Sequence, residues 1–309
     1  MAESRATSAR SAYLGVACTL AGSIGFSSKT VIVKLAYEYH IDTLTLLALR
    51  MSLALPFFVA MAWWAGPPPT RVQRADWATV LALGFIGYYV GSFLDLAGLQ
   101  YISAGLGRLV LYLYPTIVLL LSALWLRQPL RGREIASLAL SYGGIALVFN
   151  AEAHAGGDLA HTGWGVLLVF GSAVTYAIYL VAGSRVVQRI GSMRFSAYAS
   201  IVSFGFVAMH FLAARGLAAL AVAPQLYWIV LIMAVVSTVV PLWLMAEGLR
   251  RIGANQVALL SCIGPLSTIA LARIFLAEPI TPVQLGGAAF VLAGVVLISL
   301  KPRARQTGE

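Results

Sequence analysis

One stretch of this sequence occurs twice, and this repetition constrains the fold more than any other feature. Residues 94–149 align without a gap with residues 244–299 when the chain is displaced by 150 positions. Proline and glycine each have their own backbone requirements, so their identity at one fixed offset indicates duplication. The identical pairs include Gly98 with Gly248, Ile102 with Ile252, Ala104 with Ala254, Pro115 with Pro265, Pro129 with Pro279 and Gly144 with Gly294. We therefore predict two homologous halves.

The composition places both halves in a lipid bilayer. Hydrophobic residues make up 60% of the chain and charged residues 10%, whereas soluble domains carry about 25% charged residues. The net charge of +10 comes from basic residues in short segments between apolar runs, a pattern typical of membrane topology that predicts no nucleic-acid partner. Cys18 and Cys262 lie inside apolar runs and are interpreted as packing residues. We expect no metal site and no cofactor.

The apolar runs predict an all-α membrane protein with ten transmembrane helices. A helix needs about 20 apolar residues to cross the hydrocarbon core, and ten windows of that kind follow one another. The first five lie at 12–37, 43–64, 77–100, 104–126 and 133–150. The second five lie at 163–187, 195–214, 226–249, 254–276 and 282–300.

The basic residues predict the orientation of these helices. Most of the 21 Lys and Arg residues fall on one set of connecting segments, whereas residues 151–162 contain none. Because basic loops stay in the cytoplasm, both termini are predicted to be cytoplasmic, in a multi-pass protein of the inner (plasma) membrane. The predicted organisation is a cytoplasmic tail (1–11), a first repeat (12–150), an outer linker (151–162), a second repeat (163–300) and a basic cytoplasmic tail (301–309).

Two repeats of five helices must have opposite orientations, because five is an odd number of crossings. The loop charges support this inference independently. Residues 127–133 contain three arginines, whereas the aligned residues 277–283 contain no basic residue; Gln100 and Tyr101 align with Arg250 and Arg251. We therefore predict two inverted five-helix repeats. Inverted repeats are typical of secondary transporters, whose substrate site lies near the middle of the membrane.

Each half also carries a recognisable series of motifs. In the first half these are residues 98–104, Pro115, Gln128-Pro129 and Gly143-Gly144; in the second they are residues 248–254, Pro265, Glu278-Pro279 and Gly294. From about residue 12 to 300 the chain resembles the ten-span EamA-type members of the drug/metabolite transporter superfamily, and Arg50 also fits that family. The family's usual acidic residue is present as Glu278 but replaced at Gln128. The resemblance implies transport of small metabolites, including amino acids, often outward across the inner membrane.

Lys29, Arg50, Asp95 and Arg108 are charged residues in the outer half of the first repeat. Charge inside a membrane is costly, so such residues are candidates for function. Asp95 and Arg108 lie at similar depth on either side of one turn. They could form an ion pair that stabilises the hairpin, or a basic residue in excess of Asp95 could bind a substrate carboxylate. Lys29 could line the cavity or extend toward the outer headgroups.

Aromatic hydroxyl groups are the second set of candidates for a substrate cavity. Arg108, Tyr112 and Pro115 recur at helical spacing and share one face. Buried tyrosine hydroxyls need polar partners, and an apolar cavity with such groups suits amphipathic solutes such as amino acids. The further cavity candidates are Tyr88, Tyr89, Tyr114, Tyr176, Tyr179 and Ser261.

Pro115 and Pro265 interrupt matching spans, and proline removes a backbone donor. They could simply shape the packing, but their symmetry favours hinges beside a cavity. Glu247 is a candidate for an ion pair or for coupling; its position beside Arg250 and Arg251 favours an interfacial ion pair over a proton carrier. His210, alone in its span, is interpreted as a packed or interfacial side chain rather than a ligand.

These features favour a secondary transporter that exports small, amino acid-like metabolites by alternating access. Its partners would be the small-molecule substrate and the bilayer; a monomer and a homodimer both remain open. The alternatives are import or exchange, another substrate class such as nucleotide sugars or drugs, a channel, or a membrane enzyme. The sequence has no Gly-x-Ser-x-Gly or His-Glu-x-x-His motif, no ATP-binding loop and no filter-like segment. We therefore expect a protein that is not an enzyme.

Overall fold

The computed structural model describes residues 2–66, 72–126, 132–156 and 158–299, which form helices and connecting turns but no β-strand. The predicted loop motif Gln128-Pro129 and the basic tail 301–309 lie outside these residues. The helices are α1 (Ala2–Tyr37), α2 (Thr43–Trp64), α3 (Arg74–Leu83), η1 (Gly84–Val90), α4 (Gly91–Gly98), α5 (Ala104–Leu111), α6 (Tyr114–Leu126), α7 (Gly132–Gly156), α8 (Leu159–Ile190), α9 (Ser192–Ala214), η2 (Leu217–Leu220), α10 (Pro224–Ala234), η3 (Val235–Val239), α11 (Val240–Ser261), α12 (Gly264–Phe275) and α13 (Pro282–Ser299).

The lengths and apolar composition of these helices confirm an all-α membrane protein. Within the described residues, eight helical segments are long and apolar enough to cross a membrane. Two shorter apolar helices, Leu259–Phe275 and Pro282–Leu297, follow them at the positions expected for the ninth and tenth spans. Several spans are built from two helices in series, such as α3 with α4 and α5 with α6.

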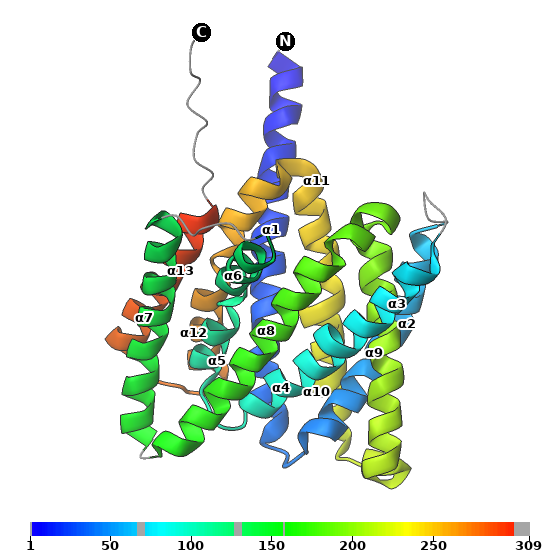
Figure 1. Cartoon of the computed structure of the whole chain (residues 1–309), viewed down its shortest axis with the longest axis vertical. Helices are drawn as coiled ribbons and strands as arrows, with labels where there is room; N and C mark the ends of the chain where they lie inside the picture. Colours follow the sequence, from blue (N-terminus) through cyan, green and yellow to red (C-terminus); the bar gives the residue numbers. More distant parts are fainter. Residues whose placement is uncertain (1, 67–71, 127–131, 157, 300–309) are drawn as a thin grey trace.

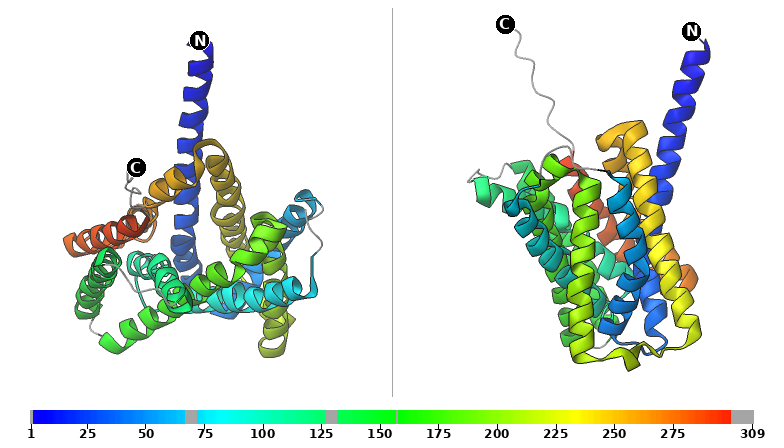
Figure 2. Two further views of the ribbon diagram at one scale, coloured as in Figure 1. Left: turned by 45° about the horizontal axis from the view of Figure 1, so that its top comes forward. Right: turned by 90° about the vertical axis from the view of Figure 1, so that its right-hand side faces the viewer.

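The two halves of the chain run in opposite directions. Helix α1 begins, and α13 ends, at the same end of the molecule, which we call the terminal end (Figure 1). Helix α8 begins at the opposite end, beside the end of α7, so it runs antiparallel to its counterpart α1 (Figure 1). The same arrangement is visible from the side in Figure 2.

The halves meet through pairs of helices, one from each half. Helix α1 packs along α11, α4 along α8, α2 along α9 and α7 along α13. The α1–α11 and α4–α8 pairs are equivalent, because displacement by 150 residues places α1 on α8 and α11 on α4 and α5. Such equivalence is expected for related halves. Glycine permits some of these close approaches: a Cβ atom on Gly98 of α4 would lie 2.5 Å from Val169 Cγ2 of α8.

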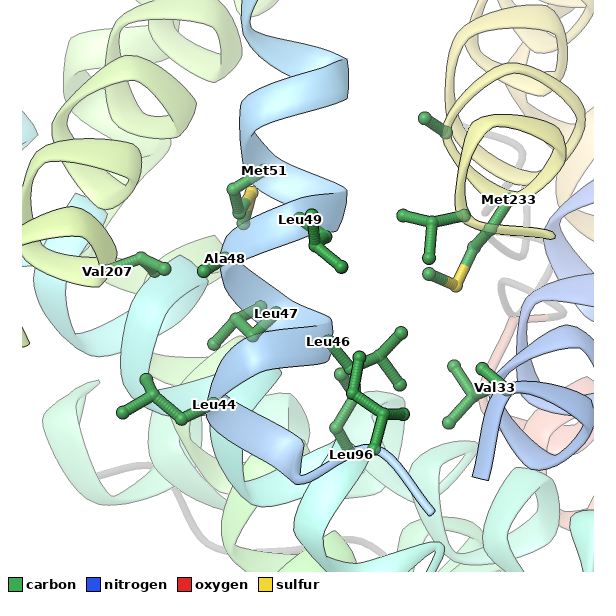
Figure 3. Packing of buried hydrophobic residues seen from close by; sticks show 14 of the residues in the cluster. Val33, Leu44, Leu46, Leu47, Ala48, Leu49, Met51, Leu96, Val207 and Met233 are labelled. Atoms are coloured by element: carbon green, nitrogen blue, oxygen red, sulfur yellow. The ribbon is translucent and has the colours of Figure 1, made fainter. Parts of the chain in front are cut away.

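Helix α2 lies at the centre of the largest apolar cluster (Figure 3). Leu46 and its neighbours pack against Val33 of α1, Leu96 of α4, Val207 of α9 and Met233 of α10. Leu46, Val207 and Met233 have no exposed surface. Because α2 is apolar on most of its circumference, it can contact helices of both halves at once.

The helix containing each predicted hinge proline is interrupted immediately before it. Helix α5 ends at Leu111 and α6 begins at Tyr114; α11 ends at Ser261 and α12 begins at Gly264. The two interruptions are therefore displaced by the same 150 residues as the sequence repeat. Pro115 and Pro265 each occupy an early position of the following helix, where a missing backbone donor costs least.

A second pair of matching irregularities is formed by the π-helical segments η1 and η3. They lie within the spans α3–α4 and α10–α11, and η3 overlaps the position obtained by displacing η1 by 150 residues. The π-helix widens the turn and often marks a functional site. Sequence patterns did not predict these segments, since neither contains proline.

Candidate functional site

The structure brings the four predicted intramembrane charges together from four helices. Lys29 comes from α1, Arg50 from α2, Asp95 from α4 and Arg108 from α5. Lys29 Nζ donates to Asp95 Oδ2 at 2.6 Å. Lys29 also interacts electrostatically with both arginines, and Arg50 with Asp95. We call Lys29, Arg50, Asp95 and Arg108 the charge cluster.

The partner of Asp95 differs from the predicted one. Asp95 pairs with Lys29, and the expected Asp95–Arg108 ion pair is wrong. The expectation considered only the hairpin between α4 and α5, whereas α1 brings a third charged side chain to the same place. The alternative that Lys29 extends to the headgroups is also wrong, because its ammonium is bound to Asp95. The guanidinium of Arg108 instead lies over the ring of Tyr112, 5.7 Å from its centroid.

Two guanidinium nitrogens of the charge cluster lack a hydrogen-bond acceptor. Within the described residues, Arg50 Nη1 and Arg108 Nε are buried and have no partner. Arg50 as a whole is only 8% exposed. A buried donor without an acceptor costs about 1–3 kcal/mol, and more when it is charged. Neither nitrogen therefore receives an acceptor from the described residues.

Five of the predicted tyrosines form a continuous row of ring contacts, which we call the tyrosine row. The centroid distances are 6.2 Å from Tyr112 to Tyr114, 5.0 Å from Tyr114 to Tyr176, 6.1 Å from Tyr176 to Tyr179 and 5.1 Å from Tyr179 to Tyr88. Tyr176 remains 37% exposed despite these contacts.

The charge cluster and the tyrosine row border each other. Arg108 interacts electrostatically with Tyr114 and Tyr176, and Arg50 with Tyr88. The cluster lies on the first repeat, whereas the row crosses to α8 of the second repeat. The arrangement combines two unpaired cationic donors with an aromatic surface, which together are suited to an anionic group attached to an apolar body.

Tyr112 also connects the site to the interruption of the other half. Its hydroxyl donates to the carbonyl oxygen of Ser261 at 2.5 Å. In a continuous helix that carbonyl would accept from residue 265, but Pro265 has no N–H. Tyr112 supplies the missing donor. The hydroxyl of Ser261, a predicted cavity group, donates to the Val257 carbonyl at 2.7 Å instead.

Two predicted candidates lie away from the charge cluster and the tyrosine row. The Tyr89 hydroxyl is 2.7 Å from His210 Nδ1, and its ring stacks on Phe206, so Tyr89 belongs to the contact of η1 with α9. Glu247 pairs with Arg250 at 2.7 Å and Arg251 at 2.6 Å, just before the kink at Gly253 within α11. Among the described residues, no cluster of three or more His, Cys, Asp or Glu side chains could hold a metal.

Sequence reasoning missed a polar contact between the halves at the end opposite the termini. Glu278, between α12 and α13, accepts from the Ala104 N–H at the start of α5, at 3.1 and 3.2 Å. Lys34 of α1 lies 3.7 Å from the same carboxylate. A carboxylate at a helix N-terminus is stabilised by the helix dipole. The conspicuous Glu278-Pro279 step was a signal, but only the structure reveals its partners.

The Lys29–Asp95 pair provides a test of the charge cluster. We expect Asp95→Asn to lower the thermal stability of the purified protein more than Lys29→Gln does. Asp95→Asn leaves three cations without a carboxylate, whereas after Lys29→Gln, Asp95 still faces Arg50; breaking a buried pair costs about 3–5 kcal/mol. The double variant Lys29→Gln/Asp95→Asn should be more stable than Asp95→Asn alone. Each variant is heated in detergent, and size-exclusion chromatography measures how much folded protein remains at each temperature. Equal losses of thermal stability in Asp95→Asn and Lys29→Gln would contradict the expected order of the variants.

Comparison with known proteins identifies the family of the chain. The model of the EamA-like transporter family matches residues 13–150 and again residues 163–300. "Uncharacterized transporter YcbK" of Bacillus subtilis is 30% identical over 305 residues, covering 94% of this chain and 96% of that protein. "Uncharacterized inner membrane transporter YhbE" of Escherichia coli K12 is 26% identical over 207 residues, covering 65% and 62%.

A solved crystal structure shares the fold. It is 17% identical in sequence and superposes with a TM-score of 0.62, covering 92% of this chain and 96% of the other. The family model matches both halves and most of the chain, the relatives are named as transporters, and the helices form a multi-pass membrane fold. The protein therefore belongs to the EamA-like transporter family of the drug/metabolite transporter superfamily and is a membrane transporter.

Proposed function

We propose that this transporter is a secondary carrier that exports small amphipathic metabolites with a carboxylate group, amino acid-like solutes among them, across the inner membrane. The observation that carries the proposal is the pair of unpaired guanidinium nitrogens on Arg50 and Arg108 beside the tyrosine row. Guanidinium groups bind carboxylates with charge-assisted hydrogen bonds. The rings of Tyr114 and Tyr176 offer an apolar surface to the rest of the solute.

Alternating access is the mechanism that the inverted halves support. Transporters with inverted repeats expose one central site to each side in turn by moving one half against the other. In this chain the matching interruptions before Pro115 and Pro265 would absorb the change in helix direction. The Glu278–Ala104 contact holds the halves together at the end opposite the termini, which supports a conformation closed at that end.

We propose that the terminal end faces the cytoplasm, as the loop charges indicate. With Cys18 and Cys262 replaced by alanine, a cysteine at Asp158 should react with a membrane-impermeant maleimide in intact cells. A cysteine at Arg250, whose side chain is 70% exposed, should react only after the cells are permeabilised. Labelling of both positions in intact cells would contradict the inverted orientation.

The hinge role of the two prolines makes a quantitative prediction. Pro115→Ala restores an N–H that can donate to the Leu111 carbonyl and straighten the span, and Pro265→Ala does the same toward Ser261. We expect each change to slow exchange about fivefold while substrate binding persists, because one restored hydrogen bond contributes on the order of 1 kcal/mol. The two variants should favour conformations open to opposite sides. Accessibility of cysteines at the two ends of the site measures this bias.

A matched control for the hinge is available within the same chain. Pro56 lies inside α2, which continues through it from Thr43 to Trp64 without interruption. Pro56→Ala should therefore leave the exchange rate unchanged. If Pro56→Ala slows exchange as much as Pro115→Ala and Pro265→Ala, the prolines act through packing alone.

The proposed function is tested by flux into liposomes that contain the purified protein. Amino acids, other organic acids, nucleotide sugars and drug-like amphiphiles form the panel of solutes. A carrier gives saturable uptake that substrate on the other side accelerates. Flux without saturation would indicate a channel, and chemical conversion of the solute without flux would indicate an enzyme; either result would overturn the proposal.

A further inference from the structure

We infer that the site selects solutes with a net negative charge over zwitterions, so that its substrate class is an organic anion with an aromatic or other apolar body. This inference rests on the proposed function and narrows it. The amino acid-like class includes molecules whose ammonium and carboxylate cancel. The charge cluster distinguishes those molecules from simple carboxylates, because its charges are not balanced.

The charge of the cluster is the first argument. Three cations, Lys29, Arg50 and Arg108, face one carboxylate, Asp95, and Lys29 already neutralises that carboxylate at 2.6 Å. Asp95 is also shielded, with only 6% of its side chain exposed. Arg50 also interacts electrostatically with Asp95, but one carboxylate cannot balance three cations, and a guanidinium does not lose its proton at physiological pH. Buried charge of one sign favours a ligand of the opposite sign.

The second argument is that, in the part of the chain that the structure describes, no carboxylate of the site other than the paired Asp95 faces an incoming ammonium group. Two polar groups near Arg108 already have backbone partners: Tyr112 donates to the Ser261 carbonyl, and the Ser27 hydroxyl donates to the Ser23 carbonyl at 2.7 Å. An ammonium next to the carboxylate of an amino acid would lie near the same cations that bind the carboxylate. Its desolvation would therefore be compensated poorly, whereas a simple carboxylate pays no such cost.

Comparison of the two halves indicates which repeat binds the anionic group of the solute. The residues displaced by 150 positions from the members of the charge cluster are Tyr179, Ser200, Met245 and Ala258, none of which is charged. The second repeat instead contributes Tyr176 and Tyr179 to the tyrosine row. The anionic group therefore binds the first repeat, and the apolar body lies toward the aromatic rings of the second. A Tyr ring could also attract an ammonium group. The three probes described below distinguish this attraction from binding of the anionic group.

Three probes with the same phenyl ring but different charges test this inference: 3-phenylpropionate, L-phenylalanine and phenethylamine. Binding of tritiated 3-phenylpropionate to the purified full-length protein is measured by scintillation proximity, and the other two compete. We expect the affinity for 3-phenylpropionate to exceed that for L-phenylalanine by about tenfold or more, and phenethylamine not to compete. Equal or tighter binding of L-phenylalanine, competition by phenethylamine, or no saturable binding of 3-phenylpropionate at millimolar concentration would each overturn the inference.

Substitutions assign the selectivity to the two arginines. Arg50→Gln and Arg108→Gln should each lower the affinity for 3-phenylpropionate about tenfold and bring the ratio to L-phenylalanine toward one. Arg250→Gln, which removes an equal charge from an exposed position, should leave both affinities unchanged. Retained selectivity in both site variants would overturn the assignment. If a variant does not elute as a single folded species, the comparison of the three probes on the unmodified protein still decides the inference.

Flux measurements on the same preparation separate the two proposals. One outcome is that 3-phenylpropionate binds selectively but that solute on the opposite side of the membrane does not accelerate its flux. This outcome would refute the secondary-carrier function and leave the charge selectivity intact. Accelerated flux of L-phenylalanine and 3-phenylpropionate at equal efficiency would support the carrier and refute the selectivity.

Discussion

Within the hydrocarbon region of a membrane, a backbone carbonyl that loses its helical donor has no water to replace it, and much of this structure follows from that constraint. Proline removes such a donor at the same place in each half. A freed carbonyl must then face other parts of the protein. At Ser261 the replacement donor is the hydroxyl of Tyr112, which belongs to the other half. The interruption of one half is thus stabilised by a side chain at the interruption of its counterpart.

The two halves share a backbone plan but have different chemistry. Matching helices, π-helical segments and interruptions recur at one displacement along the chain. The four residues of the charge cluster come from the first half, while the second contributes neutral tyrosines to the same region. Backbone symmetry is what alternating access requires, because both conformations are built from the same parts. The substrate site has no such requirement, since a single solute is itself asymmetric.

The Glu278 contact illustrates how a local motif acquires a role through tertiary structure. An acidic residue before a proline is a modest signal in the sequence, and by itself it could cap a nearby turn. Here its carboxylate crosses to the start of α5 and approaches Lys34 of α1. Each of these contacts would have to break for the halves to separate at this end. In the proposed carrier, breaking this contact would shift the balance between the two conformations.

The general architecture could be predicted from the sequence alone, because it depends on properties of individual segments. Apolar length predicted the helices, loop charge predicted their inversion, and Pro115 and Pro265 predicted where two spans are interrupted. The partner of Asp95 could not be determined in this way, because Lys29, Arg50 and Arg108 are all near in depth and only helix packing brings Lys29 within 2.6 Å. The same holds for Tyr89, whose hydroxyl lies 2.7 Å from His210 Nδ1 and outside the tyrosine row. Length, charge and proline act along one segment, whereas the choice among nearby partners depends on the distances between helices, which only the tertiary structure decides.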